Sequence, residues 1–184
     1  MFCEIVMALR KGHCYTAIER PYTRKSKVKS KSYIKTIPPV KIAKFTMGDS
    51  SGFAQGKYNY RVMLVMAEPI QIRDNAIEAA RILAHRALED RLKGNYYFVV
   101  SAYPHHILRE NKMLTGAGAD RMQKGMQLSF GKPIGVAAQL DSGKAIFTVM
   151  CQKEAIPIVR EILEKVKTKL PGKKTMIVEK INER

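Results

Sequence analysis

The sequence predicts a single α+β sandwich, in which helices pack on a mostly antiparallel sheet, with a basic extended arm at its amino-terminal end. Three observations support this fold class. A length of 184 residues suits one domain with an arm. Strand-like and helix-like periodicity alternates after the arm without an internal repeat, and an apolar fraction of 46% is sufficient for a core. We assign residues 1–44 to the arm and residues 45–184 to the domain.

The arm is defined by its charge. Between positions 10 and 44 a single acid, Glu19, opposes eleven cations. These cations are Arg10, Lys11, Arg20, Arg24, Lys25, Lys27, Lys29, Lys31, Lys35, Lys41 and Lys44. Pro21 and the pair at 38–39 interrupt regular structure, and tyrosines lie among the charges. We expect this segment to be extended and to become ordered on a partner.

The first half of the domain has the pattern strand, helix, strand. Residues 58–66 alternate apolar side chains with others, which predicts a strand. Asp74 can cap a helix that runs to about Lys93 and is closed by Gly94. The apolar stripe of this helix consists of Ile77, Ala80, Ala84, Ala87 and Leu88. Residues 95–103 are rich in β-forming side chains and predict the second strand.

The second half has the pattern hairpin, helix, strand. Residues 134–140 and 145–152 predict a hairpin around a turn at 141–144. A helix is predicted from about 154 to 170, and residues 175–180 predict a closing strand. Two halves that each combine strands with a helix are typical of a layered α+β domain.

The net charge indicates the class of partner. Thirty-three Lys and Arg oppose sixteen Asp and Glu, which gives +17. Such a charge repels itself in a compact isolated protein, and a polyanion such as nucleic acid removes that cost. A membrane is the alternative anionic partner, but the sequence has no apolar run of about 18 residues that could span one.

The cysteines and the start of the chain bear on the compartment. Cys3, Cys14 and Cys151 are odd in number and unrelated in spacing, so they predict neither a disulfide framework nor a zinc site. A reducing cytoplasm fits this pattern. The apolar start contains Glu4, and its cations follow the apolar residues, which is a poor signal peptide. We expect translation to begin at Met7.

A long glycine-rich segment at 115–131 joins the two halves and lacks clear periodicity. Loops of this length are usually functional or disordered. Arg121, Lys124 and Lys132 supply cations suited to phosphate, which favours RNA contact. A nucleotide-hydrolysing loop and a plain mobile loop remain alternatives, although the spacing departs from the phosphate-binding motif G-x-x-x-x-G-K-[ST].

Two adjacent pairs contain histidine, His105-His106 and His13-Cys14. His105 and His106 are adjacent in an extended segment, so they should face opposite sides rather than chelate one metal. Structural or RNA-stacking roles suit them better. His13 and Cys14 have the composition of a catalytic pair, but no orienting acid is evident. The sequence therefore predicts no catalytic residue, no metal site and no cofactor.

The residues from Tyr103 to Gly135 read YPHHILRENKMLTGAGADRMQKGMQLSFGKPIG. This run resembles the central segment of the universal large-subunit ribosomal protein family called L-ten-e in archaea, the QM protein in eukaryotes and L-sixteen in bacteria. Further matches are Cys14-Tyr15, the residues 21–25, 39–42 and 72–81. The archaeal type is most similar. Thr16 and Gln127 depart from the family pattern, which usually has Arg at both places, and the stretch 25–32 looks longer than usual.

The resemblance implies an α/β-hammerhead type of fold and a structural role in the cytoplasmic ribosome, not an enzyme. The implied partners are large-subunit rRNA, tRNA and neighbouring ribosomal proteins, without a small-molecule substrate or a membrane. The arm residues expected to bind rRNA are Arg10, Lys11, Arg20, Tyr22, Arg24, Lys25, Lys27, Lys29, Lys31 and Lys41. The loop residues expected near the tRNA acceptor end, where they would support tRNA accommodation, are Thr115, Gly116, Gly118, Asp120, Arg121, Lys124 and Lys132. A free-standing RNA chaperone and a nucleotide-using enzyme are the alternatives of other classes.

Overall fold

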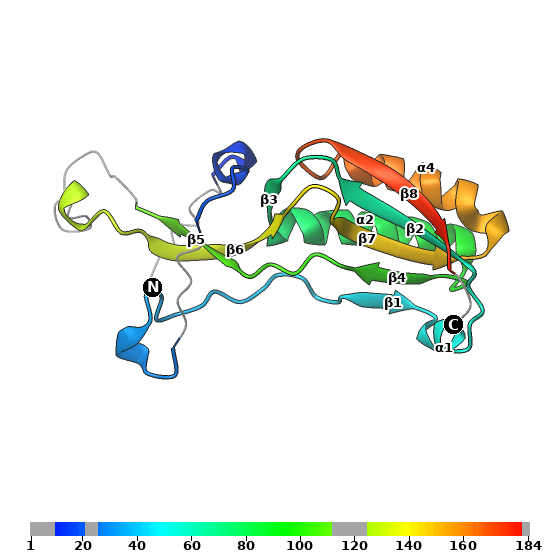
Figure 1. The fold of residues 1–184 in the computed structure, drawn as a ribbon, viewed down its shortest axis with the longest axis horizontal. Coiled ribbons are helices and arrows are strands. Elements are labelled where there is room, and N and C mark those ends of the chain that lie inside the picture. Colours follow the sequence, from blue (N-terminus) through cyan, green and yellow to red (C-terminus); the bar gives the residue numbers. More distant parts are fainter. Residues whose placement is uncertain (1–9, 21–25, 112–124, 182–184) are drawn as a thin grey trace, which may run out of the picture.

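Two antiparallel sheets organise the chain in this computed structural model, which describes residues 10–20, 26–111 and 125–181 (Figure 1). All six strand pairings among these residues are antiparallel. The α+β class and the antiparallel pairing predicted from the sequence are confirmed. The sequence predicted one sheet, however, and the structure divides the strands between two.

The larger sheet has five strands, and it corresponds to the predicted sandwich. Its strand order is β1-β4-β7-β2-β8. The strands are β1 (Thr46–Gly48), β4 (Tyr97–Val100), β7 (Ala145–Cys151), β2 (Tyr60–Met66) and β8 (Lys174–Lys180). The short helix α1 (Ser50–Ala54) follows β1. The predicted strands at 58–66 and 95–103 contain β2 and β4, and β8 begins one residue before the strand predicted at 175–180.

The helices α2 (Asp74–Leu92) and α4 (Ile156–Lys167) lie along one face of the five-stranded sheet (Figure 1). They bury apolar stripes against the sheet: Ile77 and Leu88 of the stripe predicted for α2, and Val159 and Leu163 of α4, are fully buried. They meet Phe147 and the other inward-facing strand residues in a single core. Complete burial of such side chains stabilises the fold by about 1.5–3 kcal/mol each.

The smaller sheet has three strands in the order β3-β6-β5 and extends away from the helices at the left of Figure 1. Its strands are β3 (Ile70–Arg73), β6 (Lys132–Leu140) and β5 (His106–Glu110). Its separate core is small, consisting of the buried residues Ile34, Ile107 and Val136, with Val40 packed against them. Ile34 comes from the arm, so the arm completes this second core.

The predicted hairpin at 134–152 is wrong, although both of its strands exist. β6 pairs with β3 and β5, whereas β7 pairs with β2 and β4. The turn between them is bonded to the end of β2: the Gly143 N–H donates to the Met66 carbonyl at 2.9 Å, and the Met66 N–H donates to the Lys144 carbonyl at 3.0 Å. The backbone groups of Gly143 and Lys144 therefore bond with Met66. At this turn the chain passes from the three-stranded sheet to the five-stranded sheet.

The ends of α2 agree with the sequence within a residue or two. The helix begins at Asp74, whose carboxylate accepts the N–H groups of Asn75 at 2.8 Å and Lys41 at 3.1 Å. It ends at Leu92, and the next residue, Lys93, adopts the left-handed conformation with φ of 47°. The turn predicted at Gly94 therefore starts one residue earlier.

The described residues of the arm have little regular structure, as the sequence predicts. They contain only two short 3-10 helices, η1 (Gly12–Tyr15) and η2 (Lys29–Lys31). Nevertheless Ile34 and Ile42 are buried, at 6% exposure each. The division into an arm at 1–44 and a domain at 45–184 stays a prediction, and so does the α/β-hammerhead type.

Candidate nucleic-acid interface

Two glutamines fix the first described part of the arm to the three-stranded sheet. Gln71 of β3 donates from its backbone N–H to the Thr16 carbonyl and from Nε2 to the Tyr15 carbonyl, both at 2.9 Å. Gln139 of β6, its register partner, donates from Nε2 to the Glu19 carbonyl at 2.8 Å. These bonds use the backbone of the arm. Its cationic side chains are left exposed.

The second described part of the arm, residues 26–44, is attached by apolar side chains. Ile34 enters the small core and Ile42 enters the main core. Between them, the Lys41 N–H donates to the carboxylate of Asp74 at the start of α2. The lysines of this part all remain exposed: Lys27, Lys29, Lys31, Lys35, Lys41 and Lys44.

A second acid that contacts this segment, Glu78, is already used inside the protein. Glu78 of α2 accepts hydrogen bonds from the buried Arg81, at 2.6 and 2.7 Å, and from the Ala43 N–H at 3.3 Å. The bonds from Arg81 are the main reason that the pKa of Glu78 lies below its usual value. Its negative charge is satisfied by Arg81, so it does little to neutralise the lysines of the arm.

Ion pairing is very uneven along the chain. Of the nine described cations of the arm, Arg10 alone forms an ion pair, at 3.0 Å from Glu110. The other seven ion pairs recorded for the described residues use cations from Lys57 onward. The arm cations without an ion pair to a described residue are Lys11, Arg20, Lys27, Lys29, Lys31, Lys35, Lys41 and Lys44.

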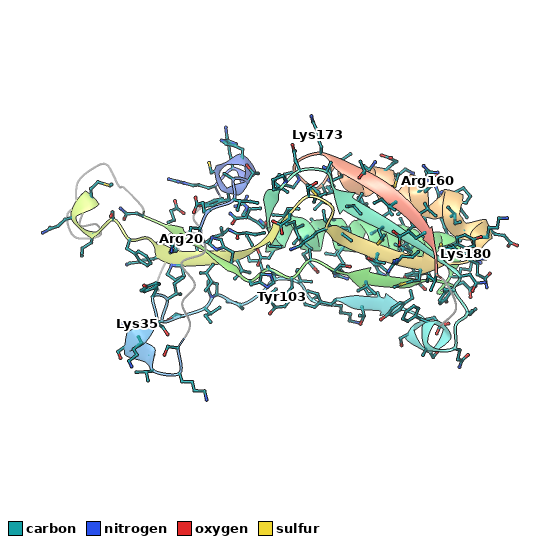
Figure 2. The ribbon with its side chains drawn as sticks, viewed as in Figure 1. Arg20, Lys35, Tyr103, Arg160, Lys173 and Lys180 are labelled. Atoms are coloured by element: carbon teal, nitrogen blue, oxygen red, sulfur yellow. The ribbon has the colours of Figure 1, made fainter. Side chains whose placement is uncertain are left out.

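Exposed cations also occur on the helical half of the molecule. Figure 2 shows Arg20 and Lys35 around the three-stranded sheet, and Arg160, Lys173 and Lys180 around the five-stranded sheet and α4. On the helical half, however, acids alternate with cations, as in the Glu161–Lys165 and Glu164–Lys167 pairs of α4. Among the described residues, the arm therefore differs by its near absence of acids, with Glu19 alone among nine exposed cations.

An aromatic row lies where the two sheets meet. The Tyr103 ring stacks on the Phe45 ring with centroids 5.4 Å apart. The centroid of the His105 ring lies 5.5 Å from that of Tyr103. Tyr103 is 52% exposed, near the middle of the molecule in Figure 2. An exposed ring supported by other rings is a platform on which an RNA base can stack. The sequence reasoning missed Tyr103, although the run Tyr-Pro-His-His directly after a strand was a usable signal.

The histidines of this region behave as their positions in a strand predict. His105 is exposed, whereas His106 is 4% exposed on the opposite face. Burial lowers the pKa of His106, so its imidazole is neutral at physiological pH. Its Nδ1 atom is buried and has no hydrogen-bond partner among the described residues. The two rings cannot bind one metal ion together.

The described residues on either side of 112–124 lie at the far end of the three-stranded sheet. There the Asn111 Nδ2 atom donates to the Gly125 carbonyl at 3.5 Å. Gly131 lies against β5 so closely that a Cβ atom there would be 2.7 Å from the Glu110 carbonyl carbon. Only glycine fits this contact. Beside it, Arg109 lies over the Phe130 ring at 4.3 Å.

The predicted site residues are only partly described. Lys132 is exposed at the start of β6, and Arg10, Lys11, Arg20, Lys27, Lys29, Lys31 and Lys41 are exposed on the arm. Outside the described residues lie Tyr22, Arg24 and Lys25 of the arm, Thr115, Gly116, Gly118, Asp120, Arg121 and Lys124 of the loop, and the expected start at Met7. The predictions for these residues remain predictions.

The described residues offer neither a metal site nor a membrane span. Residues 10–20, 26–111 and 125–181 contain no group of three or more His, Cys, Asp or Glu that could hold a metal ion. In the same residues, no helix is both long and apolar enough to cross a membrane. Cys14 is exposed and Cys151 is buried, and burial raises the pKa of the Cys151 thiol to about 11.

The overall pattern is a basic arm fixed by its backbone, a row of stacked rings and a loop at one end. A sequence model of the family described as ribosomal protein L16p/L10e matches residues 18–177. The chain belongs to this family. The L16p/L10e match spans both sheets and both long helices, and the resemblance of the run 103–135 to this family is confirmed.

Archaeal members of the L16p/L10e family are similar over nearly the whole chain. The protein of Staphylothermus marinus is 45% identical over 167 residues, which cover 90% of each chain. That of Sulfolobus acidocaldarius is 43% identical over 180 residues, covering 96% of this chain and 97% of the relative. Both are named large ribosomal subunit protein uL16. The prediction of a ribosomal protein of archaeal type, and not an enzyme, is confirmed by this membership.

Proposed function

We propose that this protein is a structural constituent of the large ribosomal subunit that binds large-subunit rRNA through its basic arm. The observation that carries this proposal is the contrast within the arm itself. Its backbone is bonded to Gln71 and Gln139 of the three-stranded sheet, but eight of its described cations have no ion pair with a described residue. Cations held in place without internal counter-charges are suited to the phosphates of a folded RNA.

The expected recognition is of RNA shape and unpaired bases. The major groove of an A-form RNA helix is too deep and narrow for side chains to read. Specificity then comes from splayed bases that stack on aromatic rings, and the supported ring of Tyr103 offers such a platform. Lysines of the arm would position the protein by contacts to phosphates on either side.

The loop at 115–131 is proposed to lie near the acceptor end of tRNA and to support its accommodation during translation. Two observations favour a projecting loop: β5 and β6 run away from the main core, and Asn111 is hydrogen-bonded to Gly125. The chemistry of peptide transfer would belong to the RNA. Other partners would be neighbouring ribosomal proteins in the cytoplasmic ribosome, with no cofactor, small-molecule substrate or membrane involved.

Salt dependence of RNA binding tests the proposal. If the eight arm cations that form no ion pair with a described residue each contact one phosphate, log affinity for a large-subunit rRNA fragment should fall with log salt at a slope of roughly −6, from about 0.7 per phosphate. The measurement is a filter-binding or fluorescence titration between low and physiological salt. A slope near zero would falsify the electrostatic account of rRNA binding.

Sedimentation of a cell extract tests the assignment to the ribosome independently. The protein, detected across a density gradient, should run with large subunits and with complete ribosomes. Washing these particles at high salt should release it, because its main contacts are ionic. A chain found mainly in the slow fractions at low salt would overturn the assignment, even if it binds RNA tightly.

A further inference from the structure

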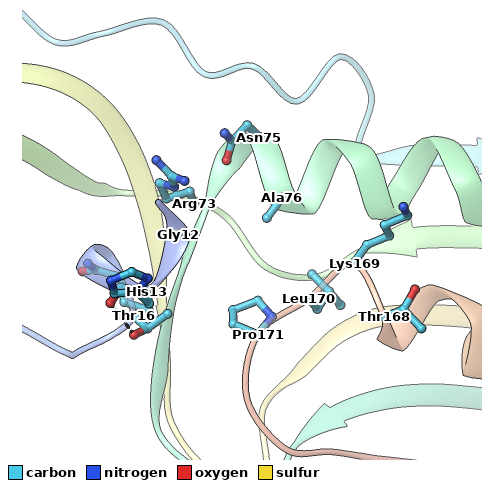
Figure 3. Close-up of a pocket in the computed structure, with 11 residues that line it drawn as sticks. Gly12, His13, Thr16, Arg73, Asn75, Ala76, Thr168, Lys169, Leu170 and Pro171 are labelled. Carbon is cyan, nitrogen blue, oxygen red and sulfur yellow. Dashed lines mark hydrogen bonds between the residues drawn. The ribbon is translucent and has the colours of Figure 1, made fainter. Parts of the chain in front are cut away.

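A pocket of about 440 Å³ lies where three distant parts of the chain meet (Figure 3). The helix η1 of the arm forms one wall, the junction of β3 and α2 forms the second, and the turn after α4 forms the third. The volume is typical of sites for small ligands, which range from about 300 to 1,000 Å³. The lining residues are Gly12, His13, Thr16, Gln71, Arg73, Asn75, Ala76, Thr168, Lys169, Leu170 and Pro171.

The lining is positive and contains no acid. Arg73 is held in place from two sides: its guanidinium lies 5.2 Å from the centre of the Tyr15 ring, and its Nη2 atom donates to the Arg10 carbonyl at 3.0 Å. The rest of its planar fork has no hydrogen-bond partner among the described residues. Lys169 is exposed and makes no ion pair with a described residue. Both cations therefore remain available to an anion.

The helix ends around the pocket have counter-charges of their own. Asn75 and Ala76 lie in the first turn of α2, whose positive end is met by the Asp74 carboxylate, which accepts the Asn75 N–H at 2.8 Å. The carboxyl end of α4 would oppose an anion, but the Lys174 ammonium donates to the carbonyls of Lys167 at 2.9 Å and Leu170 at 2.6 Å. This partly buried cation offsets the negative end of α4, so that end does little to oppose an anion held by Arg73 and Lys169.

The pocket also has an apolar wall, which simple anions do not need. Ala76, Leu170 and Pro171 supply it, and Figure 3 shows Leu170 and Pro171 between His13 on one side and Lys169 on the other. A ligand that matches cations and an apolar wall together carries both a phosphate and a flat or apolar part. A nucleotide has this chemistry.

We propose that this pocket receives one nucleotide of large-subunit rRNA that is turned out of its helix. Its phosphate would bind Arg73 and Lys169, and its ribose or base would pack against Leu170 and Pro171. This inference rests on the proposed function. A nucleotide within a polymer is favoured over a free one because the exposed Lys11, next to Gly12 of the pocket, extends the positive surface to a neighbouring phosphate.

The test compares the variants Lys169→Ala and Lys173→Ala in binding to a large-subunit rRNA fragment. Both remove one exposed cation, but Lys173 lies beyond Pro171 and does not line the pocket. Lys169→Ala should weaken binding about threefold to tenfold and reduce the salt slope by about 0.7, as expected for one phosphate. Lys173→Ala should change the affinity less than about twofold. Arg73→Lys, which keeps the charge but loses the planar fork, should also weaken binding.

Chemical probing of the RNA adds a measurement at single nucleotides, which a change in the protein's net charge alone would not alter. One nucleotide should be protected from 2′-hydroxyl acylation by the wild-type protein and by Lys173→Ala, and should become reactive again with Lys169→Ala. Unfolding midpoints of all variants verify that they fold. Equal effects of Lys169→Ala and Lys173→Ala on affinity and protection would overturn the pocket, although a steep wild-type salt slope would still support rRNA binding.

A calorimetric titration with adenosine monophosphate separates the two sources of a nucleotide. No saturable binding is expected at low millimolar concentration, because a mononucleotide lacks the neighbouring phosphates. Saturable binding that Lys169→Ala abolishes, together with unchanged RNA affinity in that variant, would mean that the pocket serves a free nucleotide and would overturn the assignment to rRNA.

Discussion

The two sheets of this protein are held together in different ways. The five-stranded sheet and its two helices bury one large core, in which Phe98, Phe147 and Leu64 are fully enclosed. The three-stranded sheet contributes Ile72 to that core, but its separate cluster has only three buried residues, Ile34, Ile107 and Val136. The first described part of the arm is fixed there by hydrogen bonds from glutamine side chains. The first region is stabilised by its own apolar surface, whereas the second depends on a few local contacts.

Charge follows the same division. Around the five-stranded sheet, cations from α2, α4 and β2 meet acids, as in the Arg91–Glu161 pair between the two helices and the Arg61–Glu179 pair between strands. On the arm, one ion pair is recorded among nine described cations. The comparison teaches that ion pairs between Lys or Arg and acids are concentrated outside the arm, although Arg160 and Lys169 there also form none with a described residue.

The largest expected effect comes from removing a core side chain of the helical region. Phe147→Ala should lower the free energy of unfolding by about 3–5 kcal/mol, because it leaves a cavity beside Phe98, whose ring centre lies 5.4 Å away. Ile34→Ala should cost about 2 kcal/mol and should act locally, since its core is small. Urea unfolding measures the first effect, and hydrogen exchange of residues 33–42 measures the second.

The control for this comparison is the exchange pattern itself. Ile34→Ala should speed exchange in the arm and leave the amides of α2 and β7 protected. If it destabilised both regions as much as Phe147→Ala does, the two sheets would form one cooperative unit and the contrast between them would be wrong.

The sequence was sufficient to predict the helices of this region, because a large core requires apolar side chains at regular helical spacing. The stripe from Ile77 to Leu88 and the stripe from Val159 to Val166 each face one continuous apolar surface. The assignment of β6 failed because a turn at 141–144 looks the same whether its strands pair or diverge. The hydrogen bonds that distinguish the two cases join this turn to Met66, which lies more than 70 residues away in the sequence.

The candidate sites show the same limit. The density of Lys and Arg identified the arm, because the charge of a residue follows directly from its type. Arg73 and Lys169 were not identified as a site, because they are 96 positions apart and meet only after α2 and α4 pack. Nothing in the local sequence of Gln71 or Gln139 indicated that their amides hold the arm, because polar residues in strands are common on exposed faces.

A smaller effect is expected on RNA binding from matched sets of charges. Replacing Lys27, Lys29 and Lys31 together by alanine should make the salt slope of rRNA binding less steep by about 2, from about 0.7 per phosphate. Stability should change little, because all three side chains are exposed. The matched control replaces Lys153, Arg160 and Lys180 of the helical region by alanine, with the same change in net charge. A loss as large in this control would mean that RNA reads the total charge and not the arm.

The smallest effect should come from an ion pair that serves the fold alone. Glu161 of α4 accepts hydrogen bonds from Arg91 of α2, at 2.5 and 3.1 Å, and from Lys165 at 2.8 Å. The bonds from Arg91, with a smaller contribution from Lys165, lower the pKa of Glu161 from 4.5 to about 2. Because the folded pKa is depressed, the stabilising contribution is complete above about pH 4.5 and is lost as the pH falls toward 2.

Glu161→Gln should therefore reduce the stability slightly at pH 7 and remove this part of its acid dependence, while rRNA binding stays unchanged. Carboxyl resonances followed by NMR between pH 1.5 and 6 report the pKa directly, and Arg91→Gln should move it back toward its ordinary value. The pair is solvent-exposed, so the effect at neutral pH should also shrink in high salt. If the Glu161 carboxyl of the wild-type protein titrated near pH 4.5, its ion pair with Arg91 would not persist in solution. The contrast between paired cations in the helical region and unneutralised cations on the arm would then lose this example.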